Sequence, residues 1–162
     1  MVHKQAFSLS PQTLRSLPFV ELRQSLPSQV ALISAFVDQL MRFIAKCRNQ
    51  EDSVLEIEIA LREALANAIV HGNQEDPHKQ VHVACRCATD GEVSITVRDE
   101  GQGFDSNAVP DPTTPENRLA KHGRGIYLMK SFMDEVRFEQ GGAAVYMRKK
   151  PNAGPAAERK AG

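Results

Sequence analysis

Several residue types are scarce in this chain of 162 residues, and each scarcity excludes a class of protein. Tryptophan is absent and aromatic residues make up only 6%, whereas 41% hydrophobic and 25% charged residues are typical of a folded soluble domain. No apolar stretch approaches the roughly 18 residues that a membrane-spanning helix needs, and the N-terminus has no apolar signal segment. We therefore expect a cytoplasmic protein with one core and no membrane partner.

Neither sign of charge is in excess. Twenty Lys and Arg balance twenty Asp and Glu, and no long basic run is present, so nucleic acid is not an expected partner. Cysteine is also scarce: Cys47, Cys85 and Cys87 form an odd number without the second pair that a zinc site needs. We interpret them as reduced, mostly buried thiols.

Hydrophobic periodicity predicts the elements of the first half. A strand is expected over 19–26, ended by Pro27, and Ser28 is expected to cap the following helix. Apolar residues at spacings of three and four predict that this helix is amphipathic. Its apolar stripe comprises Val30, Ile33, Phe36, Val37, Leu40, Met41, Phe43 and Ile44. The stripe is expected to pack on the core, and a partner-binding face is the alternative.

A second helix is expected to follow over 54–72. Ser53 and Glu56 form a capping box at its start, and Gly72 is placed to end it in the left-handed conformation. The remaining segments are predicted in chain order: a hairpin over 81–97 turning at Asp90-Gly91, a long loop over 106–121, a helix over 126–136, and strands over 136–140 and 143–149.

Two polar side chains of the second helix stand among aliphatic residues. Glu63 and Asn67 are four residues apart and share a face, whereas Glu58 and Arg62 are predicted to form an ion pair elsewhere on the helix. Buried polar groups need partners, and backbone groups are the ordinary choice. An amide oxygen at Asn67 also suits Mg²⁺, and a carboxylate at Glu63 suits a base that acts on a nucleophile attacking a γ-phosphate.

Two glycine pairs flank the long loop. Asp99 directly follows a strand and begins a D-x-G-x-G with Gly101 and Gly103, where the backbone can approach a flat ligand and the carboxylate can accept the amine proton of adenine. Gly123 and Gly125 precede a helix, whose free N–H groups suit phosphate oxygens. Each pair alone is commonly a turn, and neither extends to a Rossmann or Walker A motif.

The order of these features resembles the N, G1 and G2 boxes of the GHKL ATPases. The segments EALANAIVHGN, VRDEGQGFD and HGRGIYLMKSFMDEV are most similar to the anti-sigma regulatory factors that act as serine/threonine protein kinases. The resemblance implies an α+β fold, a two-layer α/β sandwich of the Bergerat type with a mixed, mainly antiparallel sheet and helices on one face. We expect this domain over 19–149, between an N-terminal extension (1–18) and a disordered tail (150–162).

The same resemblance implies roles for the base and metal ligands. By matching position, Glu63 would be the general base and Asn67 the Mg²⁺ ligand. Asp99 would accept a hydrogen bond from adenine, and Gly101 and Gly103 would shape the adenine pocket.

Further positions are matched around the phosphates. Gly123 and Gly125 would cap the triphosphate, with Lys121 and Arg124 as additional phosphate contacts. His71 fits the family pattern, and we interpret it as a packing or capping residue, since a helix C-terminus favours histidine.

The function that the resemblance implies is that of a kinase and binding protein in one molecule. With ATP and Mg²⁺ as cofactors, it would phosphorylate a serine or threonine of a small STAS-type anti-anti-sigma protein and sequester a sigma factor. A homodimer is left open. The alternatives are a nucleotide-gated binding module without kinase activity and the ATPase domain of a histidine kinase, which is disfavoured because none of the five histidines is followed by an acidic residue.

Overall fold

The computed structural model describes residues 18–48, 54–103 and 124–152. Their strands and α-helices are β1 (Phe19–Pro27), α2 (Ile33–Cys47), α3 (Val54–Ala66), β2 (Gln80–Ala88), β3 (Val93–Arg98), α4 (Arg124–Phe132), β4 (Glu135–Glu139) and β5 (Ala144–Lys149). Short helical segments adjoin them: η1 (Val30–Leu32) before α2, η2 (Asn67–Gly72) after α3, and η4 (Gln140–Gly142) between β4 and β5. No helix in these ranges is long and apolar enough to cross a membrane.

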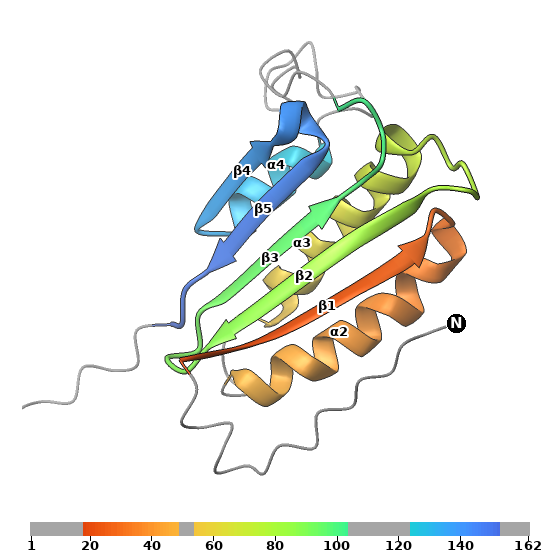
Figure 1. The fold of residues 1–162 in the computed structure, drawn as a ribbon. Coiled ribbons are helices and arrows are strands. Elements are labelled where there is room, and N and C mark those ends of the chain that lie inside the picture. The colour runs from red at the N-terminus through yellow and green to blue at the C-terminus, as the bar shows by residue number, and fades with distance from the viewer. Residues whose placement is uncertain (1–17, 49–53, 104–123, 153–162) are drawn as a thin grey trace, which may run out of the picture.

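The strands form one sheet in the order β1-β2-β3-β5-β4, and the helices cover one of its faces (Figure 1). This arrangement confirms the predicted two-layer α+β sandwich. The prediction of a mixed sheet is wrong for the described strands, because all four pairings are antiparallel. Short turns join β2 to β3 and β4 to β5, and such turns connect only antiparallel strands.

The predicted stripe of the first helix is part of the core. Val37, Leu40 and Ile44 are at most 1% exposed, so the apolar face of α2 packs against the sheet and α3 and offers no partner surface. Val30 differs from the prediction: it lies in η1 and is 47% exposed, because the α-helix begins only at Ile33. The predicted cap at Ser28 is also wrong, since its buried hydroxyl has no hydrogen-bond partner among the described residues.

Other elements follow the sequence closely. The hairpin is confirmed, with alternate residues of β2 buried and Gly91 in the turn at φ 89°. The ion pair between Arg62 and Glu58 is confirmed at 2.9 Å (Nη2 to Oε1). The last helix ends at Phe132, four residues earlier than predicted, because the chain enters β4 at Glu135. The capping box at Ser53 and the loop over 106–121 lie outside the described residues.

The cysteines lie close to one another where α2 ends beside β2. All three are free, with Cys85 and Cys87 buried and Cys47 half-buried, as expected. The pKa of the Cys47 thiol is raised, first by a hydrogen bond with Cys87 and second by burial. The Cys47 thiol is therefore a protonated packing group at neutral pH.

A buried arginine joins three parts of the fold at the same end. Arg48 is 4% exposed and follows α2 directly. Its guanidinium donates hydrogen bonds to the carbonyl oxygens of Gly91 (3.1 Å), Lys149 (3.4 Å) and Lys150 (3.1 Å). The β2–β3 turn, the end of β5 and the end of α2 are thereby connected through one cation.

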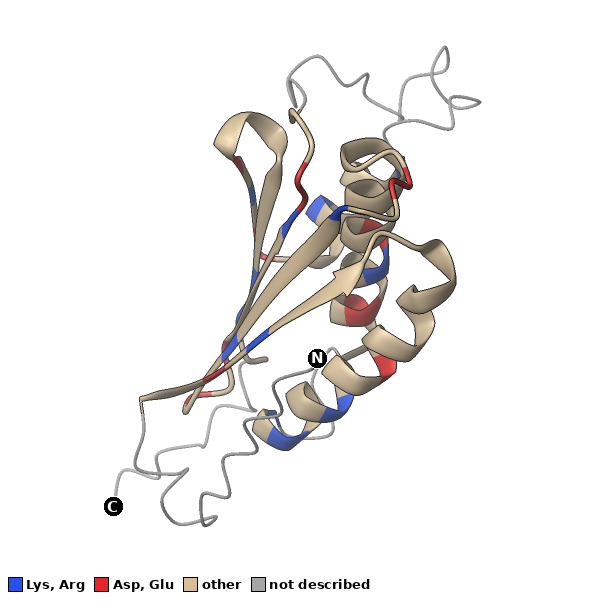
Figure 2. Cartoon of the chain, turned by 45° about the vertical axis from the view of Figure 1, so that its right-hand side comes forward, with Lys and Arg blue, Asp and Glu red and all other residues tan. Residues whose placement is uncertain are grey.

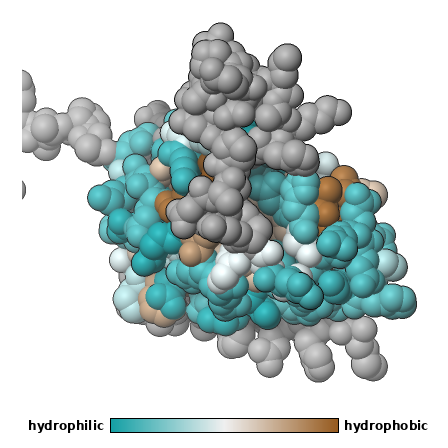
Figure 3. All heavy atoms as spheres, turned by 90° about the horizontal axis from the view of Figure 1, so that it is seen from above, coloured by the Kyte–Doolittle hydropathy of each residue, from teal (hydrophilic) through white to brown (hydrophobic). Residues whose placement is uncertain are grey.

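Positions of Lys and Arg are interspersed with positions of Asp and Glu along the described strands and helices (Figure 2). Neither sign covers a continuous face of the sheet or helices, which agrees with the balanced composition. Seen from above, the surface is largely hydrophilic with small hydrophobic patches (Figure 3). Within residues 18–48, 54–103 and 124–152, the exposed large hydrophobic residues are Phe19, Val30, Leu32, Leu55 and Tyr127.

Candidate functional site

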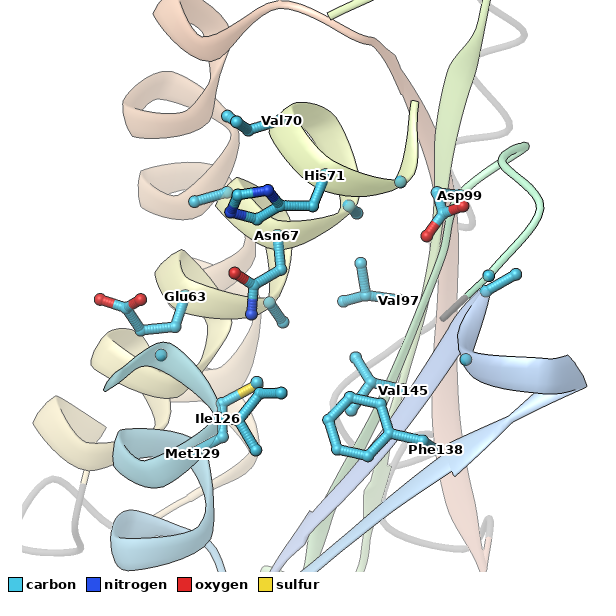
Figure 4. A pocket seen from close by; sticks show the side chains of 18 of the residues that line it. Glu63, Asn67, Val70, His71, Val97, Asp99, Ile126, Met129, Phe138 and Val145 are labelled. Atoms are coloured by element: carbon cyan, nitrogen blue, oxygen red, sulfur yellow. The ribbon is translucent and has the colours of Figure 1, made fainter. Parts of the chain in front are cut away.

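A cavity of about 450 Å³ opens between the helices and the sheet (Figure 4). Segments α3, η2 and α4 form one side, and β3, β5 and the adjoining loops form the other. Polar side chains line it on both sides: Glu63, Asn67 and His71 on the helical side, and Asp99 across the cavity beside the sheet (Figure 4). A ligand in the cavity can therefore contact polar groups at two separate places.

The middle of the cavity is apolar. Val97 and Val145 are paired across β3 and β5, and Phe138 is the β4 partner of Val145. Ile126 and Met129 of α4 face them (Figure 4). Such walls suit a flat, mostly apolar ring. The sequence predicts that Val97 lies on the apolar face of the hairpin and that Ile126 and Met129 face inward, but it assigned none of the five residues to the site. Only the strand register makes Val97 and Val145 neighbours.

Asp99 is held rigidly at the end of β3. It is 8% exposed, and its backbone N–H donates to the carbonyl oxygen of Ala143 at 2.9 Å. One carboxylate oxygen, Oδ1, accepts a hydrogen bond from the Gly101 N–H at 2.8 Å. Burial raises the pKa of this carboxyl above its usual value. Asp99 is thus a partly desolvated carboxylate that can accept a hydrogen bond from an N–H group of a ligand.

Gly72 supports Asp99 through its small size and does not act as a left-handed cap. It ends η2 without a positive φ, and positive φ values come only at Gln74 (56°) and Glu75 (55°). The prediction for Gly72 is therefore wrong. A Cβ at this position would overlap the Asp99 carboxyl group, lying 2.7 Å from Oδ1. Glycine is required because helix end and carboxylate approach so closely.

The predicted second helix changes from an α-helix to a π-helix at Asn67. Helix α3 ends at Ala66, and η2 continues it as a π-helix, closed by a hydrogen bond from Asn73 N–H to Ala68 O at 2.8 Å. Short π-helical segments are frequent at functional sites. His71 lies in this segment with an exposed side chain beside the cavity, so the packing role is wrong, while capping stays a prediction.

The first turn of α4 lies against Glu63 and Asn67. A Cβ at Gly125 would be 2.6 Å from Glu63 Oε2 and 3.3 Å from the Asn67 amide nitrogen. Gly125 therefore allows a helix N-terminus, with its free N–H groups, to approach both side chains. Arg124 also lines the cavity. The predicted phosphate contacts Lys121 and Gly123 lie outside the described residues.

The two glycines after Asp99, Gly101 and Gly103, lie at different positions relative to the cavity. Gly103 lines the cavity in a left-handed conformation (φ 78°), and a side chain there would overlap the backbone of Gly141. Gly101 lies behind the cavity wall, where a side chain would overlap the carbonyl group of Gly72. The structure thus brings together Glu63, Asn67, Asp99, Gly103, Arg124 and Gly125, with Gly101 supporting them.

Comparison with known proteins agrees with this geometry. The model of the histidine kinase-like ATPase domain family matches residues 25–149. The anti-sigma F factor of Oceanobacillus iheyensis is 35% identical over 112 residues, covering 66% of this chain and 76% of that protein. The anti-sigma F factor of Geobacillus stearothermophilus is 38% identical over 112 residues, with the same shares covered.

A solved structure supports the fold. The crystal structure of the RsbU and RsbW domains of a Mycobacterium tuberculosis protein matches with a TM-score of 0.58 and 20% identity. The match covers 82% of this chain and 32% of that one, so the chain spans about a third of the solved protein. Since the family model covers most of the chain and the relatives match over most of their length, the chain belongs to the histidine kinase-like (GHKL) ATPases, in the group of anti-sigma regulatory factors.

Proposed function

We propose that this protein is an anti-sigma factor and an ATP-dependent serine/threonine kinase of a small antagonist protein. An ATPase domain implies ATP binding, and the cavity offers complementary ends for that ligand. The adenine would lie between the apolar walls with its amino group donating to Asp99. The triphosphate would extend toward the first turn of α4, beside Arg124 and Gly125.

The observation that carries the kinase proposal is the position of Glu63. This carboxylate stands one helical turn from Asn67 and against the N-terminus of α4, at the opposite end of the cavity from Asp99. A serine or threonine hydroxyl of the antagonist would attack the γ-phosphorus, and Glu63 would take its proton. The bond from the γ-phosphorus to the β–γ bridging oxygen breaks, which yields ADP and a phosphorylated antagonist.

Asn67 is the candidate ligand for a magnesium ion. Its amide faces the cavity, and Mg²⁺ is commonly held by one or two protein oxygens together with water and substrate phosphates. A neutral amide oxygen fits this donor set. When bound, the ion would neutralise the phosphate charge while Glu63 orients the hydroxyl.

The partners are proposed from the relatives. Proteins of two genera that match over 76% of their length are named anti-sigma F factors, which favours a sigma factor as the sequestered partner of this chain. A STAS-type anti-anti-sigma protein would be the phosphorylated antagonist, and the phosphorylation would release it so that the sigma factor is bound again. A homodimer stays a prediction, which light scattering on the purified protein measures.

Glu63→Gln and Glu63→Ala test the kinase. The variants are incubated with γ-labelled ATP, Mg²⁺ and the antagonist encoded with this protein, and transfer is counted on the antagonist. We expect transfer to be abolished while calorimetric ATP binding remains, because Glu63 acts on the attacking hydroxyl. The control is Glu58→Gln, which removes a carboxylate of the same helix whose partner is Arg62.

Three outcomes distinguish the kinase from the alternative explanations. Unchanged transfer in both Glu63 variants contradicts the role of Glu63 as base. A wild type that binds ATP and changes its affinity for the sigma factor, but never labels the antagonist, is the nucleotide-gated binding module. Equal loss in the Glu58 and Glu63 variants attributes the effect to the helix and not to the base.

A further inference from the structure

A second buried polar side chain stands directly behind Asp99. Asn73 follows η2 and is 0% exposed. Its Oδ1 accepts a hydrogen bond from the Glu100 N–H at 2.7 Å, and its Nδ2 donates to the carbonyl oxygen of Gln80 at 2.9 Å. The amide therefore uses both of its ends to connect the end of η2, the start of β2 and the residue after Asp99.

The Glu100 side chain is held by hydrogen bonds to two residues of β2. Its Oε2 accepts from the Gln80 N–H at 3.0 Å, and its Oε1 accepts from His82 Nε2 at 2.9 Å. His82 Nδ1 in turn lies 2.8 Å from the hydroxyl of Ser25 on β1. The hydrogen bond from His82 lowers the pKa of the exposed Glu100 carboxyl, which keeps it ionised as an acceptor.

These bonds fix the backbone after Asp99, the Ala143 carbonyl oxygen accepts from the Asp99 N–H before it, and the Gly101 N–H holds the Asp99 side chain. The Glu100 N–H belongs to the peptide unit that contains the Asp99 carbonyl, so a shift of Glu100 moves Asp99. Exposed hydrogen bonds contribute little to global stability, whereas a displacement of a few tenths of an ångström decides whether a ligand hydrogen bond forms.

We propose that Asn73 and Glu100 are positioning residues that hold Asp99 where it reads the amino group of the purine. This inference rests on the proposed role of Asp99 and adds a determinant of base selectivity that does not touch the ligand. Without the two ties, the apolar walls and the phosphate end would still bind a purine nucleotide. The protein would lose its preference for a base that carries an amino group.

The test compares two nucleotides that differ only at that group. Dissociation constants for ATP and for purine riboside triphosphate, which lacks the amino group, are measured by calorimetry with Mg²⁺ on the full chain. The variants are Asn73→Ala, Glu100→Ala and Glu100→Gln. The control is Glu92→Gln, which removes a surface ion pair with Arg148 near the other end of β3. Thermal unfolding measures whether each variant is folded. If Asn73→Ala does not fold, the two Glu100 variants test the proposal.

We expect ATP to bind about three- to tenfold more weakly to Asn73→Ala and Glu100→Ala, because a small shift of Asp99 weakens its hydrogen bond to the ligand without removing it. Affinity for purine riboside triphosphate should change by less than about twofold, because no amino group is available for the lost contact. Glu100→Gln keeps one acceptor oxygen and should lie between Glu100→Ala and the wild type. Glu92→Gln should leave both affinities unchanged.

Other results overturn the proposal. Equal weakening of the binding of both nucleotides makes the two residues purely structural. Unchanged affinity for both nucleotides in folded variants removes their positioning role, while Asp99 keeps its own. A wild type that binds both nucleotides equally well refutes the role of Asp99 and, with it, this inference. A wild type that binds neither refutes the proposed function itself.

Discussion

The contact between Gly72 and Asp99 makes a substitution with one added methyl group informative. In Gly72→Ala the new Cβ would lie 2.7 Å from Asp99 Oδ1, whereas ordinary contact begins at 3.4 Å. Because Cγ and Oδ2 of Asp99 would lie nearer still, the carboxylate must retreat by more than about 0.7 Å. Asp99 cannot rotate freely, because the Gly101 N–H holds Oδ1 and the Ala143 carbonyl holds its backbone.

The displacement determines the size of the effect on ligand binding. A hydrogen bond of about 2.9 Å becomes a separation of more than about 3.6 Å, which is no longer a hydrogen bond. Hydrogen bonds to charged groups contribute about 1.5–3 kcal/mol, so ATP should bind Gly72→Ala roughly ten- to 150-fold more weakly. Overpacking should also lower the free energy of unfolding by about 1–3 kcal/mol.

Calorimetry for ATP and urea unfolding measure the two effects, and Gly91→Ala is the matched control. Gly91 has φ 89° in the distant hairpin, where a Cβ meets only Pro151 at 3.6 Å. That variant should lose about 1–2 kcal/mol of stability through backbone strain and keep its affinity for ATP. If Gly72→Ala behaves in the same way as Gly91→Ala, Gly72 is only a helix terminator and the reasoning is refuted.

Three further predictions concern other contacts. Arg48→Ala should lower the free energy of unfolding by about 2–4 kcal/mol in urea titrations, because three carbonyl groups lose a buried cation; a change below about 0.5 kcal/mol would contradict this. Burial raises the pKa of Asp99, so the folded state holds that proton more tightly and wild-type stability falls as pH rises from the ordinary aspartate value through the raised one. Asp99→Asn should therefore gain stability relative to the wild type over this window in urea titrations at several pH values, and a gap that does not vary with pH would argue against it. Gly125→Ala should displace the flexible end of Glu63, reducing antagonist phosphorylation about tenfold or more with little change in thermal unfolding; full activity would show that the contact is unimportant.

Much of the fold was predictable because its signals are local. Alternation in β2 and β3, the turn at Asp90-Gly91 and the buried stripe of α2 depend on residues a few positions apart, and the structure confirms each of them. Two of the wrong predictions, those for Ser28 and Gly72, each depended on a single cap residue. Ser28 matches the residue preference for a helix start, but the chain makes the turn η1 before the α-helix begins.

The residues of the candidate site also divide into those that local sequence identifies and those whose role depends on tertiary contacts. Glu63 and Asn67 were identifiable because a carboxylate and an amide four residues apart share a helix face among apolar residues, and Asp99 because it ends a strand before two glycines. Gly72 and Asn73 were not identifiable by role, since their importance comes from contacts with residues 99 and 100 on another strand.

The sequence by itself determined which residue types stand at which spacing, and with them the secondary structure and the chemistry of the two polar ends of the cavity. Only the tertiary structure decided which apolar residues meet between those ends. Strand register and helix packing join positions as far apart as Val97 and Val145, and these pairings arise from the energy of the whole core. Local pattern cannot contain that information, because each pairing depends on every other element that packs with it.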